Sequence, residues 1–252
     1  MMLEPVPGEP AAVAVCDGTR VLVLADYHAG LEVALRYDGV ELRSRARERR
    51  EAVLTLLERT GADRVVFLGD LANAIGNPST EERTELATLL GAVAGRVPVT
   101  VVKGNHDGDI EDVADEVDAH HPVAVTSTDG VRMGDVGFVH GHTWPAVEVL
   151  EADVVAMGHE HPMVRLEDEV GGARAERAWL RGKLVPDPFE DHHGASLDID
   201  GELVVCPGFN DLLGGTWTNT GQGFLSPYLP DGFRDAQAYL LDGTRLGNYE
   251  QV

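Results

Sequence analysis

The sequence predicts an α/β fold, a four-layer α-β-β-α sandwich in which two mixed sheets pack together with helices outside. Its 252 residues are 43% apolar, enough for one domain with a substantial core, so we treat residues 1–252 as a single domain. Strand-like runs alternate with helix-like segments in the first half, and a series of strands follows in the second half. Several of these strands end in polar side chains, as Asp70 ends Val65–Leu68. Open α/β sheets bind their ligands at that edge.

The first half of the chain is predicted to open with a hairpin. Two apolar runs, Ala11–Cys16 and Arg20–Ala25, flank Asp17-Gly18, a dipeptide typical of a tight turn between antiparallel strands. Ser79 with acidic residues after it is a typical helix N-cap, and Gly61 is a typical helix end. The other elements expected here are helices over residues 42–59 and 79–94, and buried strands over 65–68 and 98–102.

The second half is predicted to consist mainly of short strands. Residues 122–126, 131–133 and 136–139 are expected to form antiparallel strands, and residues 145–150 a short helix. Later strands are expected over residues 153–157, 163–166, 175–181, 203–206 and 236–241. The segment 182–194 is rich in Pro, Asp and His and is predicted to be a loop. The glycine-rich segment 207–230 is predicted to be a long ordered loop, a kind of segment that is commonly functional.

The charge balance is extreme, with 43 acidic and 20 basic residues, a net charge of −23, and only Lys103 and Lys183 as lysines. Such a surface is typical of a halophile's cytosolic protein, because molar salt shortens the Debye length to about 3 Å and screens the self-repulsion. A very acidic mesophilic protein is the alternative.

No apolar run approaches the roughly 18 residues of a membrane span. Residues 1–10 are acidic and Pro-rich, unlike a signal peptide. We therefore expect a cytoplasmic protein.

The two cysteines, Cys16 and Cys206, both lie beside strand-like runs. Their spacing matches neither a metal site nor a redox motif. Reduced, inert thiols are therefore expected, as in a cytosolic protein, and a disulfide between the first and last strands is the alternative.

Potential metal ligands occur at the ends of five strand-like runs. They are Asp26 and His28, Asp70, Asn105 and His106, His140, and His159 and His161. Oxygen and imidazole ligands without cysteine suit Mn, Fe, Zn or similar ions, rather than a thiolate zinc site. Residues at i and i+2 of an extended backbone project to one face, which suits Asp26 with His28. Two ions that share a carboxylate need one residue between the groups, and Asp70 is the candidate.

In this order the motifs resemble those of the calcineurin-like metallophosphoesterases. The motifs are Asp26-x-His28, Gly69-Asp70-x-x-Asn73, Gly104-Asn105-His106-Asp107, His140-Gly141 and Gly158-His159-x-His161. They span roughly Val21 to Pro162. A shorter match, Pro207-Gly208-Phe209-Asn210 with Gly214-Gly215, resembles the tail of the archaeal SbcD-related, ICC-like branch.

The resemblance implies a phosphoester hydrolase with two divalent metal ions, with Mn as the first expectation and Fe, Zn or Ni as alternatives. A hydroxide between the ions would attack phosphorus in line. His106 would protonate the leaving oxygen or stabilise the transition state, with Asp107 orienting it. Substrate-contacting roles are implied for His142, Phe209 and Asn210. One ion would be held by Asp26, His28, Asp70 and His161, and the other by Asp70, Asn105, His140 and His159.

Other polar residues have competing interpretations. Asn73 either belongs to the site or is a plain loop residue, and His142 either supports the ligands, faces substrate or is a loop residue. Residues 187–193 are expected to be a solvated acidic loop rather than an extra metal site. The triplet Asp191-His192-His193 is a motif after which another phosphoesterase family is named, but the other motifs of that family are missing. His120-His121 is expected at the surface.

The motifs define a reaction type but leave the phosphoester substrate open. The first hypothesis is a phosphodiesterase or nuclease acting on DNA or RNA. The second is a phosphatase or phosphodiesterase for nucleotides or other small phosphoesters, and the third is a non-catalytic scaffold of the same fold. The arginines between Arg43 and Arg50 surround much of one helix and are expected to be solvated. Trp217, Phe224 and Tyr228 either stack on nucleic acid or form a packed loop core. The oligomeric state is open, a homodimer being one option.

Overall fold

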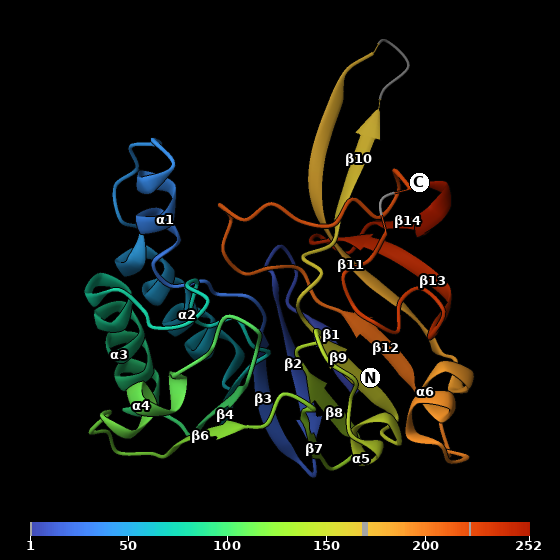
Figure 1. Cartoon of the computed structure of the whole chain (residues 1–252), viewed down its shortest axis with the longest axis horizontal. Helices are drawn as coiled ribbons and strands as arrows, with labels where there is room; N and C mark the ends of the chain where they lie inside the picture. The colour runs from blue at the N-terminus through green and yellow to red at the C-terminus, as the bar shows by residue number, and fades with distance from the viewer. Residues whose placement is uncertain (1, 168–170, 222) are drawn as a thin grey trace.

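The computed structural model describes residues 2–167, 171–221 and 223–252, and their strands form two sheets. The first sheet has six strands in the order β1-β2-β3-β4-β5-β6. Strands β3 to β6 are parallel, and β1 and β2 extend the sheet in antiparallel fashion. The strands are β1 (Leu3–Pro5), β2 (Ala11–Cys16), β3 (Thr19–Leu24), β4 (Arg64–Phe67), β5 (Val99–Val102) and β6 (Val123–Thr126). The helices of this half are α1 (Leu31–Tyr37), α2 (Ala46–Thr60), α3 (Thr80–Ala94) and α4 (Ile110–Asp115) (Figure 1).

The second sheet has the order β14-β13-β11-β12-β9-β8-β7, and β10 pairs with β11. Strand β9 is parallel to both β8 and β12, and the other pairs are antiparallel. The hairpin of β10 and β11 projects from the body of the molecule (Figure 1). The strands are β7 (Val131–Met133), β8 (Val136–Val139), β9 (Val154–Met157), β10 (Met163–Glu167), β11 (Ala173–Leu184), β12 (Glu202–Val205), β13 (Phe233–Leu240) and β14 (Arg245–Asn248). The helices are α5 (Val147–Leu150), α6 (Pro186–His193) and a final 3₁₀ turn, Tyr249–Gln251.

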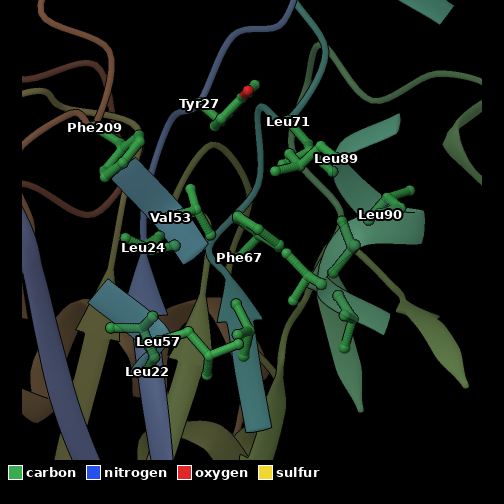
Figure 2. Close-up of a cluster of buried hydrophobic side chains, with 14 of the residues drawn as sticks. Leu22, Leu24, Tyr27, Val53, Leu57, Phe67, Leu71, Leu89, Leu90 and Phe209 are labelled. Carbon is green, nitrogen blue, oxygen red and sulfur yellow. The ribbon is translucent and has the colours of Figure 1, made fainter. Parts of the chain in front are cut away.

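Three buried apolar clusters separate the layers, and alternate residues of one strand belong to different clusters. Leu22 and Leu24 of β3 join residues of α2 and α3 in the cluster between the first sheet and its helices (Figure 2). Val21 and Val23 instead belong to the cluster between the two sheets, with Phe138 of β8. A third cluster lies on the outer face of the second sheet, with residues of α5 and α6. This period-two alternation is what burial on both faces of a sheet requires. The predicted four-layer fold of two mixed sheets is confirmed.

The sequence signals for the first hairpin and for α3 are confirmed. Strands β2 and β3 pair antiparallel around Asp17 and Gly18, whose φ values of 49° and 81° match the left-handed turn such a dipeptide favours. Ser79 caps α3, and its hydroxyl accepts from the backbone N–H of Glu82 at 3.2 Å. The Glu82 carboxylate accepts in return from the Ser79 N–H, which completes a capping box.

Several element predictions are wrong. Residues 182–194 are not a loop, because β11 continues to Leu184 and α6 occupies Pro186–His193, with a proline in its first turn. Residues 123–126 form β6, which is parallel to β5 rather than antiparallel. Strands β7 and β8 do pair antiparallel with each other, as predicted, and β8 is in addition parallel to β9. The helix predicted from residue 42 begins at Ala46. Helices α1 and α4 and strands β1 and β14 are additional elements, each seven residues or shorter.

The two cysteines are free and buried between the sheets. Burial raises the pKa of the Cys16 thiol to about 11 and that of Cys206 well above its ordinary value, which keeps both in the inert thiol form. The prediction of reduced cysteines is confirmed. Among the described residues, no helix is both long and apolar enough to cross a membrane.

Candidate metal centre

Loops at the carboxyl ends of the central strands of both sheets bring two groups of His and Asp side chains together. Asp26, His28 and His161 form one group, and Asp70, His140 and His159 form the other. Within each group the candidate ligand atoms all lie within 4.8 Å of one another. Asp26, His28 and Asp70 follow strands β3 and β4 of the first sheet, whereas the other three histidines follow β8 and β9 of the second. Each group therefore needs both sheets.

Asp70 connects the two groups. Its Oδ2 lies 3.6 Å from Nε2 of His28 in the first group, and its Oδ1 lies 3.3 Å from Nε2 of His140 in the second. Asn105 reaches the second group as well, with its Oδ1 3.1 Å from the same His140 nitrogen. Asp26 Oδ1 lies 3.3 Å from Nε2 of His161. The structure therefore brings all seven predicted ligand residues together, with Asp70 between the groups.

The backbone at this centre is held in an uncommon conformation. Five of its residues have left-handed backbone angles, with φ between 43° and 69°. This conformation is energetically unfavourable for an L residue that has a Cβ. Only two other non-glycine residues among those described, Asp17 and Asp235, have positive φ. Strain of this kind persists where the surrounding structure enforces it, and it concentrates at functional sites. The five residues are Asp26, His28, Asp70, His159 and His161.

Two of the motif glycines are required by close approach. A Cβ at Gly104 would lie 2.3 Å from the backbone nitrogen and from Oδ1 of Asp70. A Cβ at Gly69, which also has a φ of 77°, would lie 2.4 Å from the imidazole of His140. These glycines therefore allow the ligand loops of the first sheet to pack against one another and against the second sheet.

The imidazoles present the arrangement expected of metal-binding histidines. Nε2 of His28 and Nε2 of His161 are buried without a hydrogen-bond partner among the described residues, and each faces a carboxylate. The other ring nitrogen of each is held, His28 Nδ1 by Oδ1 of Asn73 at 3.2 Å and His161 Nδ1 by the carbonyl of Gly214 at 3.1 Å. Metal-binding histidines are oriented by such outer contacts. Since carboxylates, an amide oxygen and imidazoles form the donor set, the residues fit a pair of divalent transition-metal ions.

The protonation states of the imidazoles differ within the centre. Burial lowers the pKa of His28 and of His159 to about 4, so both rings are neutral at pH 7, as a ligand must be. Burial alone would raise the pKa of Asp70, but the hydrogen bond and charge of His140 outweigh it and hold that pKa below its ordinary value. Burial would lower the pKa of His140, but its contact with Asp70 raises it to about 9. Asp70 is thus ionised beside the neutral rings of His28 and His159, whereas His140 is protonated at pH 7 and must release that proton to bind a metal ion.

His106 lies at the edge of this centre, with its side chain 25% exposed. Its backbone N–H donates to Oδ1 of Asp70 at 2.9 Å, and its ring Nδ1 contacts the carbonyl of Asn73. The predicted orienting role of Asp107 is therefore taken by Asn73. The buried Asp107 carboxylate instead accepts from the backbone N–H groups of Ala72 and Gly104, both at 2.9 Å, and so fixes the loops around Asp70.

The residues predicted to contact substrate occupy different environments. His142 lies beside the second group, its ring centroid 5.2 Å from that of His140, and its buried Nδ1 has no hydrogen-bond partner among the described residues. Phe209 is buried and stacks on Tyr27 at 6.0 Å. The buried Asn210 donates to the carbonyls of Tyr27 and His28, at 3.1 and 3.4 Å. Both therefore support the Asp26-x-His28 segment, and direct contact with substrate stays a prediction.

Glu160 and Asn73 are the supporting residues that sequence reasoning missed or underrated. Glu160 is fully buried, and its carboxylate accepts from segment 214–226 rather than entering the centre. The available signal was its position between His159 and His161 in the Gly158-His159-x-His161 motif. Asn73 contacts both His28 and His106, so it belongs to the site.

The acidic segment before Gly194 is not brought into the centre. It forms α6, in which His192 stacks on Trp144 at 4.3 Å and Nε2 of His193 contacts the carbonyl of Pro145 at 3.0 Å. In the part of the chain that the structure describes, neither histidine belongs to a potential metal-binding group.

Comparisons with known proteins found one family model and similar solved structures. Residues 20–179 match the family model of the calcineurin-like phosphoesterase superfamily domain. The crystal structure of the nuclease MPE of Pseudomonas putida is similar over 97% of this chain and 100% of that one, with a TM-score of 0.56 and 16% identity. YfcE, a phosphoesterase from E. coli, is similar over 90% of this chain and 96% of its own, with a TM-score of 0.41 and 19% identity. A search of curated proteins found no match.

Proposed function

The chain belongs to the calcineurin-like phosphoesterase superfamily, and from this premise we propose that it is a two-metal phosphodiesterase that acts on nucleic acid strands. The observation that carries the two-metal reaction is the pair of His/Asp groups joined through Asp70. The groups draw on both sheets, and nitrogens of His28, His140 and His161 lie 3.3–3.7 Å from carboxylate oxygens of Asp26 and Asp70. A structural site would need only one such group.

We assign the ligands as follows. Asp70 serves both ions, since it contacts a histidine of each group. When bound, two divalent ions neutralise the charge of the phosphoryl group and activate a water as nucleophile. The mixed oxygen and imidazole set supports Mn, with Fe, Zn or Ni as alternatives. The first ion would be held by Asp26, His28, Asp70 and His161, and the second by Asp70, Asn105, His140 and His159.

His106 is proposed to supply the proton to the leaving oxygen. Its Nδ1–H donates to the carbonyl of Asn73, which fixes the ring and leaves Nε2 directed away from that contact. In the imidazolium form, Nε2–H can donate to an oxygen of a phosphoester held at the edge of the centre. Positioned general acids contribute about 10²–10⁴ in rate.

His106→Ala tests this role. We expect kcat to fall by about 10²–10⁴, with two metal ions per chain retained when counted by mass spectrometry. Full loss of metal in this variant would refute the assignment, because His106 would then be acting as a ligand.

The substrate class is tested with one assay panel in molar KCl and Mn²⁺, because the net charge of −23 favours high salt. The substrates are single-stranded DNA, bis-p-nitrophenyl phosphate, p-nitrophenyl phosphate and cyclic nucleotides. Cleavage of DNA and of the bis-ester supports the proposal. Monoester turnover without DNA cleavage would replace it with a small-molecule phosphatase. Full metal occupancy without turnover would indicate a scaffold.

A further inference from the structure

The carboxylate of Glu160 clamps two stretches of the glycine-rich segment beside the metal centre. These stretches, residues 214–218 and 224–226, are called the wall below. Glu160 accepts from the Thr216 hydroxyl at 3.0 Å and from the backbone N–H groups of Leu225 and Ser226 at 3.0 and 2.8 Å. Because Glu160 is fully buried and stands between His159 and His161, the same short segment fixes both the ligands and the wall.

The wall also touches the ligands and their neighbours directly. The carbonyl of Gly214 contacts Nδ1 of His161 at 3.1 Å, and the Ser226 hydroxyl donates to the carbonyl of Gly141 at 2.7 Å. A Cβ at Gly215 would lie 1.9 Å from the carbonyl oxygen of His161, so only glycine allows this approach. The wall is therefore held at both ends against the second-sheet side of the centre.

The wall presents an aromatic side chain next to two arginines. Thr216 and Thr218 are buried, whereas Trp217 between them is partly exposed and its backbone bridges to Met163 at the start of β10. Trp217 lines a surface cavity of about 470 Å³ together with Arg165 of β10 and Arg174 of β11. Arg165 is the third residue of β10 and follows His161 by four residues, so it lies at most about 14 Å from that residue.

The two arginines remain available to an anion. Their ion pairs, Arg165 with Glu167 at 3.0 Å and Arg174 with Glu176 at 3.4 Å, are formed by side chains that are 40–67% exposed. Exposed pairs of this kind contribute little free energy, so a phosphate can compete for the guanidinium groups. An aromatic face beside cationic side chains is the combination that binds single-stranded nucleic acid.

We propose that Trp217, Arg165 and Arg174 form a nucleotide subsite for a single strand leading away from the metal centre, with Glu160 as the positioning residue that holds Trp217 in place. This inference rests on the proposed phosphodiesterase function. It adds that one base beyond the scissile phosphate stacks on the indole of Trp217, while a backbone phosphate contacts the arginines.

Binding measured without catalysis tests the subsite. In EDTA, a fluorescein-labelled oligo-dT is titrated with each variant and followed by anisotropy. Loss of one stacked base is worth about 1–3 kcal/mol, so Trp217→Ala should raise Kd about 5- to 150-fold, and Trp217→Phe should restore most of the affinity. Arg165→Gln and Arg174→Gln should each reduce the slope of log K against log salt by about 0.7. An unchanged Kd in Trp217→Ala overturns the subsite.

Glu160→Gln tests the clamp, with the exposed Glu151→Gln as the matched control. An amide in place of the carboxylate cannot accept all of the donors, so hydrogen exchange at the Leu225 and Ser226 amides should become faster in Glu160→Gln alone. KM for the oligonucleotide should rise at least about tenfold more than KM for bis-p-nitrophenyl phosphate, since only the longer substrate reaches Trp217. Unchanged exchange overturns the clamp. Equal losses on both substrates would show a purely structural role.

The two proposals fail separately. Absence of hydrolysis with every phosphoester in molar KCl and Mn²⁺ would overturn the phosphodiesterase, yet the binding measured in EDTA would still decide the subsite. If the protein hydrolyses DNA and Trp217→Ala leaves the KM for DNA unchanged, the proposed phosphodiesterase function stands and the proposed subsite is overturned.

Discussion

Two clusters of buried polar and charged side chains adjoin the loop that follows β3, and they are built in opposite ways. One is the metal centre. The other joins the guanidinium of Arg49 in α2 to the carboxylates of Glu32 in α1 and Glu85 in α3. Gly30, two residues after the ligand His28, donates its N–H to Glu85 at 3.0 Å, so the two clusters are linked through one loop.

The two clusters differ in how many of their buried polar atoms form hydrogen bonds or close ion pairs within the cluster. Arg49 makes paired contacts with Glu32 at 2.7 and 2.9 Å, and further contacts with Glu85 at 2.7 and 3.2 Å. In the metal centre the distances between carboxylates and imidazole nitrogens are 3.3–3.9 Å, and Nε2 of His28 and of His161 lack hydrogen bonds to described residues. Buried charge that pairs internally supports the fold. Buried ring nitrogens without hydrogen-bond partners, facing carboxylates beside strained backbone, are arranged for a ligand.

The largest effect is expected when the metal centre loses the residue shared by both groups. Asp70→Asn should abolish phosphoesterase activity and reduce the bound metal to at most one ion per chain, because a neutral amide cannot bridge two cations as a carboxylate does. Metal content by mass spectrometry and turnover of bis-p-nitrophenyl phosphate check this. Asp112→Asn, an exposed aspartate of α4, is the control and should retain both. An active Asp70→Asn with two ions would contradict the bridging role.

Disruption of the Arg49 cluster should lower the free energy of unfolding rather than the activity. Arg49→Met leaves Glu32 and Glu85 buried without their cation, which is expected to cost about 3–5 kcal/mol of unfolding free energy. Urea unfolding measures the loss, and the folded variant should still bind two metal ions. If Arg49→Met unfolds like the wild type, the cluster does not carry the stability that we assign to it. If the folded variant loses metal, the two clusters are not independent.

The change in unfolding free energy between metal-free and metal-loaded protein should also distinguish the clusters, with a smaller effect. An ion that binds only the folded chain stabilises it by about 2.7 kcal/mol at a hundredfold excess over Kd. Wild type and Arg49→Met should therefore gain similar free energy when Mn²⁺ is added to the EDTA-treated protein, whereas Asp70→Asn should gain much less. A gain in Asp70→Asn equal to that of the wild type would mean that the stabilising ion binds elsewhere.

The two clusters also differ in what the sequence predicts. The seven proposed ligands, which the structure brings together, could be predicted from residues at strand ends, because each motif is local and the strand before it is apolar. The Arg49 cluster was not predicted, because its three members come from three helices and each resembles a solvated charge in its own segment. The arginines near residue 45 were accordingly expected to be exposed, but Arg49 is only 6% exposed.

The supporting contacts of the centre show the same limit. Asn73 could be placed near the site by its spacing from Asp70, but the contact between its carbonyl and His106 depends on how two loops pack. The hydrogen bonds of Glu160 join residues that are 56 to 66 positions apart. Helix α6 was missed because Pro, Asp and His disfavour a helix interior, whereas here proline occupies the first turn and Gly194 ends the helix with a φ of 66°. Local signals therefore predict ligands, and long-range contacts decide what holds them.

The smallest expected effect concerns the acid sensitivity of the Arg49 cluster. Burial alone would raise the pKa of Glu32, but hydrogen bonds from Arg49 and from the backbone of Arg45 outweigh it and lower that pKa below its ordinary value. In the unfolded chain the Glu32 carboxylate therefore takes up a proton at about pH 4.3. In the folded chain it does so at a lower pH. The stabilisation is complete above the unfolded pKa and is lost as the pH falls toward the folded pKa.

Glu32→Gln isolates this contribution, because the other carboxylates titrate in both proteins. Urea unfolding of the EDTA-treated proteins between pH 3 and 6 should show the wild type more stable at pH 6, with the gap narrowing as the pH falls. Two parallel curves would mean that the Glu32 carboxylate titrates alike in the folded and unfolded chains. The hydrogen bonds of Arg49 would then not favour its charged form, and the contrast with the metal centre would have to rest on geometry alone.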